Sequence, residues 1–532
     1  MAAMGYRTTA WVLSAAAALR GLLVPMLWAQ DPLLSSPVAD ASVYLEWAST
    51  GVDPLGPGAW WFPPLFPWLL GLFGGGLVAA LVFNALLGLC TTAATMSLAH
   101  RLFDGKAAVA AGVFVTLYAP QIFWETRVMP TTLATTLTTC ALLLALDPTP
   151  RRTTGAGLLA GLAALARPNL LLLIPCHALG LLAARRSKAA LCLVLGAALP
   201  IGMSLGRNLA EDGSAALVTV NGGVNFSFAW ADTAASSFLA PGPEWGDIRG
   251  QRAHTEETGA GWPLGLAWIA DHPSGAFRLA ALRIRALLGN QETGIVHHPA
   301  PEARAFPLWR VLCVPFLALM LCALPGIARV SRRHGWTLGV HALAIALPCV
   351  LFFFYSRFRL PLMPLVCALA GGGLYRWRAW LRPTTALAAA GLALVSLWTP
   401  EAVDRLDRSG SWLQIARVER EHGRPGAAAQ ACIEALALHH GHRGAEDLLF
   451  LHSVEMPAEV EPVLRAAVLP GIEHPAEATC RLALGLALLQ KGDLGSISQA
   501  RPILESLMEH PRHGPRAARA AQAAMDALEP GG

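Results

Sequence analysis

Long apolar segments separated by short polar ones run through the first 399 residues of the chain. A helix needs about 17 to 25 apolar residues to cross a bilayer. Runs that approach this length lie at 9–29, 76–99, 107–122, 131–147, 189–206, 308–328, 336–355, 360–375 and 384–399. A further segment, 155–184, is interrupted by Pro168, so we expect two short helices there with Arg167 extended between them. The pattern predicts an all-α, polytopic membrane helical bundle over 1–399 with about eleven crossings, followed by a polar helical domain over 400–532.

Composition supports a membrane class. Apolar residues make up 54% of the chain and charged residues 14%, whereas about a quarter of an ordinary soluble protein is charged. The net charge is only +5 and the basic residues fall in short clusters between apolar runs, so we expect no nucleic-acid partner. Arg20 interrupts the first run and no small-x-small cleavage site follows it, so we expect this run to stay as an anchor.

The basic clusters predict the orientation, because positively charged loops stay on the cytoplasmic side. The clusters are Arg101/Lys106, Arg151/Arg152, Arg185/Arg186/Lys188, Arg329/Arg332/Arg333 and Arg376/Arg378/Arg382. Placing them all in the cytoplasm predicts a multi-pass protein of the inner (plasma) membrane with a cytoplasmic N-terminus. The loops 30–75 and 207–307 and the domain 400–532 then share the outer side.

The region 400–532 has helical periodicity but no spanning segment. Trp412-Leu413-Gln414-Ile415-Ala416 with Gly423, and Leu482-Ala483-Leu484-Gly485 with Gly492, are typical of tetratricopeptide-like helical hairpins. The two glycines are 69 residues apart, about two periods of this repeat. We expect a degenerate unit near 446–470, and a plain helical solenoid is the alternative. Whether Cys432 and Cys480 form a disulfide is left open.

The acidic loop 30–75 is the strongest candidate for chemistry. No Lys or Arg occurs from residue 21 to residue 100, yet the loop carries the carboxylates Asp31, Asp40, Glu46 and Asp53. A helix over 38–49 would bring Asp40, Tyr44 and Trp47 to one face, with Glu46 offset. A carboxylate within hydrogen-bond reach of a reacting hydroxyl acts as a general base. The alternative is that these carboxylates are simply solvated.

Motifs in order along residues 9–380 resemble those of the GT-C glycosyltransferases, in particular bacterial enzymes similar to protein O-mannosyltransferase and lipid A aminoarabinose transferase. They are Arg20, Asp40-x-x-x-Tyr44, Pro63-Pro64-Leu65-Phe66-Pro67, Gly157-Leu158-Leu159-Ala160-Gly161-Leu162-Ala163 ending in Arg167-Pro168, Arg207-Asn208, Val220-Asn221-Gly222-Gly223-Val224-Asn225-Phe226 and Tyr355-Ser356-Arg357-Phe358-Arg359-Leu360-Pro361. The resemblance implies inverting transfer of a sugar from a polyprenyl-phosphate carrier to a lipid, glycan or protein acceptor on the outer face of the membrane.

The resemblance also implies residue roles. An Asp in the first outer loop is the family's usual base candidate, which implies Asp40, and Glu46 is our second candidate. The departing phosphate needs positive charge, for which the candidates are Arg357, Arg359, Arg207 and Arg167. Tyr44, Asn221, Gly222 and Gly223 are the candidate substrate-loop residues, although a tight turn needs the same glycines.

The family often carries a second acidic residue, sometimes associated with a divalent cation, for which Mg or Mn is our expectation. Ala41 follows Asp40 here, so an acidic pair is missing at that position. We predict Glu125 as the replacement, with an ion pair to Arg127 as the alternative, and metal dependence is left open. His297-His298, near Glu292 and Glu302, lack the helical spacing of a familiar zinc site and carry little weight.

Two other classes fit part of the pattern. A secondary transporter would show paired hydropathy repeats and polar residues near the bilayer midplane, whereas the arginines here gather near one face. A membrane-anchored scaffold would use the repeat domain to bind a protein partner, but a bundle of this size exceeds what anchoring needs. The leading prediction is a membrane glycosyltransferase whose partners are a polyprenyl-phosphate sugar, an envelope acceptor, membrane lipids and a protein bound by the repeat domain.

Overall fold

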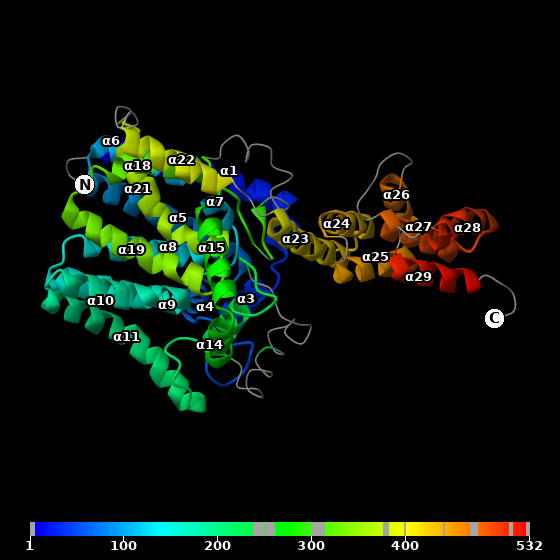
Figure 1. Ribbon diagram of the computed structural model, residues 1–532, viewed down its shortest axis with the longest axis horizontal. Helices are drawn as coiled ribbons and strands as arrows, with labels where there is room; N and C mark the ends of the chain where they lie inside the picture. The colour runs from blue at the N-terminus through cyan, green and yellow to red at the C-terminus, as the bar shows by residue number, and fades with distance from the viewer. Residues whose placement is uncertain are drawn as a thin grey trace. The chain divides into compact units, whose positions relative to one another are not determined.

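The computed structural model describes residues 6–237, 251, 261–294, 296–299, 314–375, 382–397, 401–439, 442–468, 477–509 and 514–527. Within these ranges the regular structure is entirely helical, as the sequence predicts. The chain forms two compact units. The first comprises Met1–Gln30, Pro37–Thr293 and Ala305–Pro400, and the second comprises Asp31–Ser36, Gly294–Arg304 and Glu401–Gly532. Figure 1 shows the first unit as a bundle of long, roughly aligned helices.

Four helices in the described part of the chain are long and apolar enough to cross a membrane. They are α1 (Tyr6–Gln30), α5 (Leu77–Leu102), α11 (Ser187–Asp212) and α19 (Arg332–Leu351). α6 (Gly105–Leu117) and α7 (Ala119–Glu125) make a fifth crossing if they are counted as one span bent by 57°. Pro120 lies at the start of α7 and lacks the amide N–H that would continue α6. The protein is therefore a multi-pass membrane protein.

The shorter apolar helices are α8 (Thr131–Ala145), α9 (Pro150–Ala166), α10 (Leu173–Ala183), α18 (Phe316–Ile327), α21 (Met363–Leu374) and α22 (Pro383–Leu397). Every predicted apolar run contains a helix, but length and hydropathy support only four or five full crossings among the described residues, so the figure of about eleven stays a prediction. The break at Pro168 is confirmed. Arg167 is extended, at φ −149° and ψ 108°, between α9 and the 3-10 helix η1 (Pro168–Leu172).

Glycines permit very close packing of α9 against α11. A Cβ on Gly157 would overlap the carbonyl oxygen of Leu193, and a Cβ on Gly196 would overlap that of Thr154. The two backbones are therefore nearer to each other than any side chain allows. Small residues are typical of helix interfaces in membranes, where close backbone contact drives association.

Charged and polar contacts lie at both ends of α8. At its C-terminal end Asp147 lies 3.9, 2.6 and 3.9 Å from three arginines, Arg101, Arg152 and Arg333. At its N-terminal end Thr131 accepts a hydrogen bond from Arg167 at 3.2 Å. A helix of 15 residues is roughly 22 Å long, so these are opposite ends of the bundle. Members of three predicted cytoplasmic clusters thus lie at the same end of the bundle. Arg376 and Arg378 of the fifth cluster lie outside the described residues.

Short helices gather at the Arg167 end. They are α3 (Asp40–Thr50), α4 (Leu65–Leu72), α12 (Gly222–Ala229), α14 (Trp262–Asp271), α15 (Pro273–Leu288) and α20 (Ser356–Arg359), which the 3-10 helix η3 (Leu360–Leu362) joins to α21. Trp230, just after α12, donates to Leu351 O at the C-terminal end of α19 at 2.8 Å. The helix predicted over 38–49 is α3, with its start two residues later.

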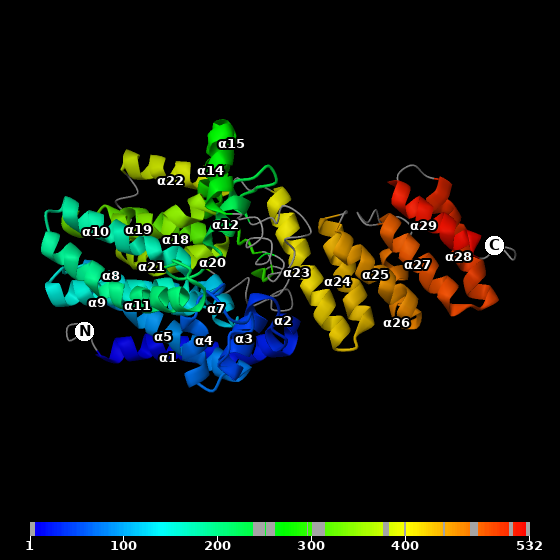
Figure 2. The ribbon, with the colours of Figure 1, turned by 90° about the horizontal axis from the view of Figure 1, so that it is seen from below.

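The second unit contains α2 (Pro32–Ser35) and a series of helices that Figure 2 shows stacked in chain order, namely α23 (Glu401–Glu421), α24 (Pro425–Leu438), α25 (Arg443–Glu455), α26 (Pro457–Ala467), α27 (Glu477–Lys491), α28 (Leu494–Glu509) and α29 (Gly514–Asp526). The turns after α23 and α27 contain Gly423 and Gly492, both at positive φ, 69° and 72°. Cys432 and Cys480 are buried free thiols. Assignment of these hairpins to the tetratricopeptide family stays a prediction.

Candidate active site

Asp40 begins α3 under an unusual backbone constraint. The preceding residue, Ala39, has φ 52° and ψ −129°, a region that residues with a side chain rarely adopt. Such strain persists where the surrounding structure enforces it, and it is common at functional sites. Asp40 itself lies in the first turn of α3, where the helix dipole favours a negative charge.

Arg357 is the partner of Asp40. Its Nη2 lies 3.7 Å from Asp40 Oδ2, and the two side chains are 18% and 36% exposed. The guanidinium lies 5.6 Å from the ring centroids of Tyr355 and Phe358 and 5.9 Å from that of Trp124. Within the described part of the chain its N–H groups donate no hydrogen bond, although Nε is buried. Buried donors are normally satisfied, so Arg357 is suited to bind an oxyanion.

Arg167 holds the backbone of Arg357 in place. Its Nη1 donates to Arg357 O at 3.0 Å and to Thr131 Oγ1 at 3.2 Å, and its guanidinium lies 4.5 Å from the Phe358 ring centroid. The break between α9 and η1 places this side chain at the site. Arg167 and Arg357 together carry two positive charges against the single carboxylate of Asp40, which leaves the site net positive.

Tyr44 lies one helical turn after Asp40 and is buried. Its ring makes edge contacts with Phe62 and Phe66, at centroid distances of 5.4 and 5.7 Å. Burial, together with the negative charge of Asp40, raises the pKa of Tyr44 well above its usual range, so its hydroxyl stays a neutral donor. Trp60 and Phe62, in the segment that leads to α4, are also buried, whereas Trp68 is exposed.

Arg359 is held differently from Arg357. It is completely buried, and it donates to Glu292 Oε1 at 2.7 Å, to Leu287 O at 3.1 Å and to Gly289 O at 2.6 Å. The Phe316 ring lies 3.8 Å from its guanidinium carbon. The structure therefore satisfies this predicted phosphate ligand with the protein's own groups and does not bring it to Asp40.

Arg207 holds the 58–60 segment. Its Nη1 donates to Gly58 O, and its guanidinium lies 4.6 Å from the Trp60 ring centroid. The neighbouring Asn208 is buried, donates to Ala216 O and Val218 O at 2.9 and 3.0 Å, and accepts from the Trp60 amide. These contacts fix the shape of both predicted outer loops, and none of them involves Asp40.

Asn221, Gly222 and Gly223 form the start of α12. Asn221 accepts a hydrogen bond from Thr219 Oγ1 at 2.8 Å. Neither glycine has positive φ, which contradicts the expectation of a tight glycine turn. A Cβ on Gly223 would lie 3.0 Å from the Cα of Gly261, so this glycine permits close packing of α12 against the start of α14.

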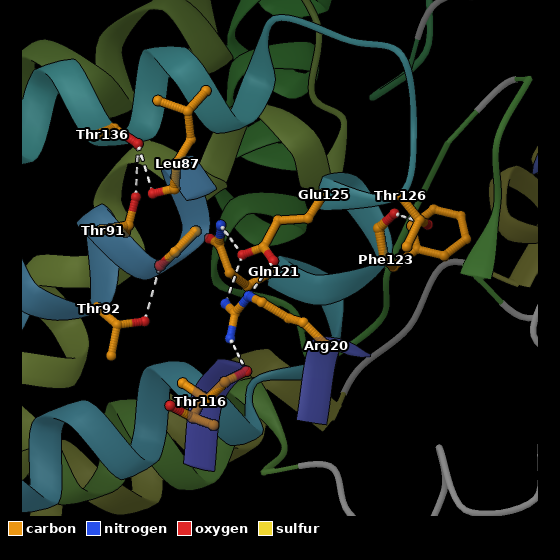
Figure 3. A network of polar contacts seen from close by, with 12 residues as sticks. Arg20, Leu87, Thr91, Thr92, Thr116, Gln121, Phe123, Glu125, Thr126 and Thr136 are labelled. Atoms are coloured by element: carbon orange, nitrogen blue, oxygen red, sulfur yellow. Dashed lines mark hydrogen bonds and ion pairs between the residues drawn. The ribbon is translucent and has the colours of Figure 1, made fainter. Parts of the chain in front are cut away.

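Glu125 forms a buried ion pair with Arg20, which Figure 3 shows reaching from α1 to α7. Arg20 Nε and Nη2 donate to the two carboxylate oxygens at 2.7 and 2.8 Å, and both side chains are 3% exposed. Gln121 donates to Oε1 at 3.1 Å. A Cβ on Gly88 would overlap this carboxylate, so the glycine provides the space for it.

Two further predicted features stay apart from Asp40. Glu46 lies on the exposed side of α3, away from the buried Tyr44. Among the described residues there is no group of three or more His, Cys, Asp or Glu side chains placed to hold a metal ion, so the donor set does not fit a divalent cation at Asp40. His297 and His298 are buried in the second unit, and Glu302 lies outside the described residues.

The sequence interpretation missed the groups that contact the two arginines of the site, namely Trp124 and Phe358 at Arg357 and Thr131 at Arg167. Their spacing gave no signal, because they come from three segments that meet only in the folded bundle. Only Phe358 could have been found from the sequence, because it lies between the candidate phosphate ligands Arg357 and Arg359.

No protein-family model and no curated protein matches the chain. Among solved structures, ArnT from Cupriavidus metallidurans bound to undecaprenyl phosphate is 15% identical, with 98% of this chain and 88% of that chain covered and a TM-score of 0.40. Its apo state is 16% identical, with coverages of 83% and 78% and a TM-score of 0.38. The oligosaccharyltransferase AglB from Archaeoglobus fulgidus, in complex with an inhibitory peptide and a dolichol-phosphate, is 14% identical, with coverages of 78% and 58% and a TM-score of 0.37. These values describe a distant likeness, so the roles of the residues are argued from the site alone.

Proposed function

We propose that the protein is an inverting glycosyltransferase that moves a sugar from a polyprenyl-phosphate carrier to a lipid, glycan or protein acceptor. The observation that supports this most is the pairing of Asp40 with Arg357. A partly exposed carboxylate lies beside a guanidinium whose N–H groups have no hydrogen-bond partner in the described chain. A base next to an oxyanion site is what transfer from a phosphate leaving group requires.

In this mechanism the acceptor hydroxyl attacks the anomeric carbon and gives its proton to Asp40. As the new carbon–oxygen bond forms, the bond from that carbon to the phosphate oxygen breaks, and its electron pair stays on the phosphate. Arg357 binds the phosphate oxygens through its paired N–H groups, and Arg167 adds a second positive charge. The neutral hydroxyl of Tyr44 donates a hydrogen bond to a substrate oxygen. No step depends on a divalent cation, because the donor set around Asp40 does not fit one.

The proposal places the Asp40 end of the bundle on the outer side of the plasma membrane, with the N-terminus in the cytoplasm. The gathering of Arg101, Arg152 and Arg333 at the opposite end supports this, because basic loops stay in the cytoplasm. Alkaline phosphatase fused at Thr399 is expected to be active, and an inactive fusion would reverse the orientation. We further propose that the helical domain 400–532 presents or recognises a protein acceptor.

The test compares two carboxylates of the same helix in purified, reconstituted protein. Asp40→Asn is expected to lower kcat about 10²- to 10⁴-fold, the usual contribution of a general base. Glu46→Gln is expected to have a much smaller effect, because its side chain lies on the exposed side of α3. The reverse pattern would assign the base to Glu46. Absence of any transfer by the unmodified protein across several polyprenyl-phosphate sugars would instead favour a transporter or scaffold.

A second substitution tests the anion site. Arg357→Lys keeps the positive charge but loses the planar pair of donors that matches a phosphate. We expect weaker donor binding and a lower kcat, because phosphate contacts strengthen as the leaving group gains charge. Unchanged kinetics in this variant would remove Arg357 from the donor site.

A further inference from the structure

α14 exposes apolar side chains to an unusual extent. Trp262, Leu264 and Leu266 are each at least half exposed, while Gly265 is buried against Phe226. Before Asp271, which ends the helix, α14 contains no charged residue. Isolated exposed apolar residues are normal on a soluble surface, but a contiguous patch marks an interaction site.

The next helix, α15, also exposes apolar side chains, and an exposed arginine lies beside them. Phe277 is 78% exposed, and it is followed at i+4 and i+7 by Ala281 and Ile284, which are also exposed. Arg278 lies one residue on, about 100° around the helix, and is exposed beside this stripe. An apolar stripe with an exposed basic residue beside it fits a helix that lies in a membrane interface.

The position of α15 agrees with this pattern. Arg283, on its buried side, donates to Val350 O at 3.2 Å, at the C-terminal end of α19. Ser396, near the end of α22, donates to Leu288 O at 2.6 Å. Figures 1 and 2 show α15 running across the direction of the long helices rather than along it. It therefore lies level with the C-terminal ends of two apolar helices.

We propose that α14 and α15 form a pair of membrane-surface helices, with the aromatic and aliphatic side chains in the acyl region of the outer leaflet and Arg278 at the lipid phosphates. Lipid is the occupant that fits, because α15 meets the end of the apolar helix α22, where Leu394 and Leu397 are also largely exposed. Arginine beside exposed Trp and Phe is the residue set of a bilayer interface.

This helix pair also connects the membrane surface to the candidate active site, a connection that rests on the proposed function. Leu287 O and Gly289 O, at the C-terminal end of α15, accept the hydrogen bonds of Arg359. Arg359 lies two residues after Arg357 in the same short helix, α20. Seating of α15 in the leaflet therefore sets the position of the guanidinium that faces Asp40.

The test places the photoreactive amino acid p-benzoylphenylalanine at position 277 of the full chain, in nanodiscs of phosphatidylethanolamine and phosphatidylglycerol. The matched control carries it at position 46, where Glu46 is exposed and charged. Irradiation and mass spectrometry are expected to show at least ten-fold more acyl-chain adduct at 277 than at 46. Equal yields would overturn the inference, and so would a crosslinked dimer as the main product at 277, because the patch would then contact a second copy.

Phe277→Glu tests the connection to the active site, with Phe277→Leu as its control. We expect a several-fold lower transfer rate only in the glutamate variant, because a carboxylate is excluded from the acyl region. Adduct formation at 277 without any sugar transfer by the unmodified protein would refute the proposed function and leave the membrane-surface position of α14 and α15 in place. Transfer without adduct would do the opposite.

Discussion

The buried ion pair between Arg20 and Glu125 predicts a specific pattern of stabilities. Two short hydrogen bonds join the groups, and each side chain is 3% exposed, so water does not screen the pair. Glu125→Gln leaves the guanidinium of Arg20 buried without its counter-charge. Breaking a buried pair in this way costs about 3 to 5 kcal/mol, because the remaining charge is uncompensated.

The double variant Arg20→Met/Glu125→Leu separates a packing role of Glu125 from a catalytic one. Replacing both members of a buried pair by apolar residues is often neutral or stabilising, by about 1 to 4 kcal/mol. The double variant is therefore expected to be more stable than either single variant. If Glu125 only joins α7 to α1, sugar transfer returns together with stability. If Glu125 acts on the substrate, stability returns and transfer does not.

Two controls isolate the effect of burial. Glu455→Gln breaks the ion pair between Glu455 and Arg420. This pair also has a short N–O distance, 3.0 Å, but its side chains are 40% and 34% exposed. Exposed pairs contribute about 0 to 1 kcal/mol, so this variant should change little. Gly88→Ala adds a methyl group where the Glu125 carboxylate lies and changes no charge, so it should destabilise by about 1 to 3 kcal/mol.

The assay is thermal unfolding of each variant in the same nanodiscs. Glu125→Gln and Arg20→Met should each lower the midpoint by several degrees, and Glu455→Gln by much less. The reasoning is refuted if Glu125→Gln is no more destabilising than Glu455→Gln. It is also refuted if the double variant is as unstable as the sum of the two single variants, since the groups would then act independently.

Two further predictions concern the start of α3 and the helical domain. Ala39→Gly should raise the unfolding midpoint, by about 1 kcal/mol in stability, because glycine adopts the backbone at φ 52° without strain; a lower midpoint would show that no strain is stored there. At Glu461, the hydrogen bond from Lys491 and a second from Arg465 hold the pKa of the carboxyl below its usual range. The folded pKa is thus depressed, so this contribution to stability is present above the unfolded pKa of about 4.3 and is lost as the pH falls through the folded value. Glu461→Gln should therefore lower the midpoint at pH 7 and lose its effect in acid, and a difference that is constant with pH would contradict the assignment.

Local rules were sufficient to predict the helices and the break at Pro168. The ring of Pro168 clashes with a helical conformation of the residue directly before it, so Arg167 was predictable as an extended residue at a helix end. The same holds for α3, where the i, i+4 relation of Asp40 and Tyr44 depends only on helical geometry. The parts of the candidate site that depend only on neighbouring residues or on helical spacing are therefore predictable from the sequence.

The partners of buried charges were not predictable in this way. Arg20 and Glu125 are 105 residues apart, and Arg359 and Glu292 are 67 apart. Which carboxylate meets which guanidinium depends on the order in which the helices pack, and no local pattern in one sequence contains that order. The number of membrane crossings shows the same limit, because several of the apolar helices are shorter than a bilayer and their membership of the bundle depends on neighbours.

Arg357 and Arg359 show how geometry divides residues that look equivalent in the sequence. Two positions apart on a helix, side chains point about 200° away from each other, so one arginine of Ser356-Arg357-Phe358-Arg359 must turn from the other. Arg359 turns into the protein, where Glu292 balances its charge. Arg357 turns to Asp40 at a distance too long for a hydrogen bond and keeps its donors unused within the described chain. Arg359 therefore fixes the backbone of α20, and this leaves Arg357 free to bind a substrate phosphate. For this reason Arg357→Lys should weaken donor binding, whereas Arg359→Lys should lower the stability of the protein.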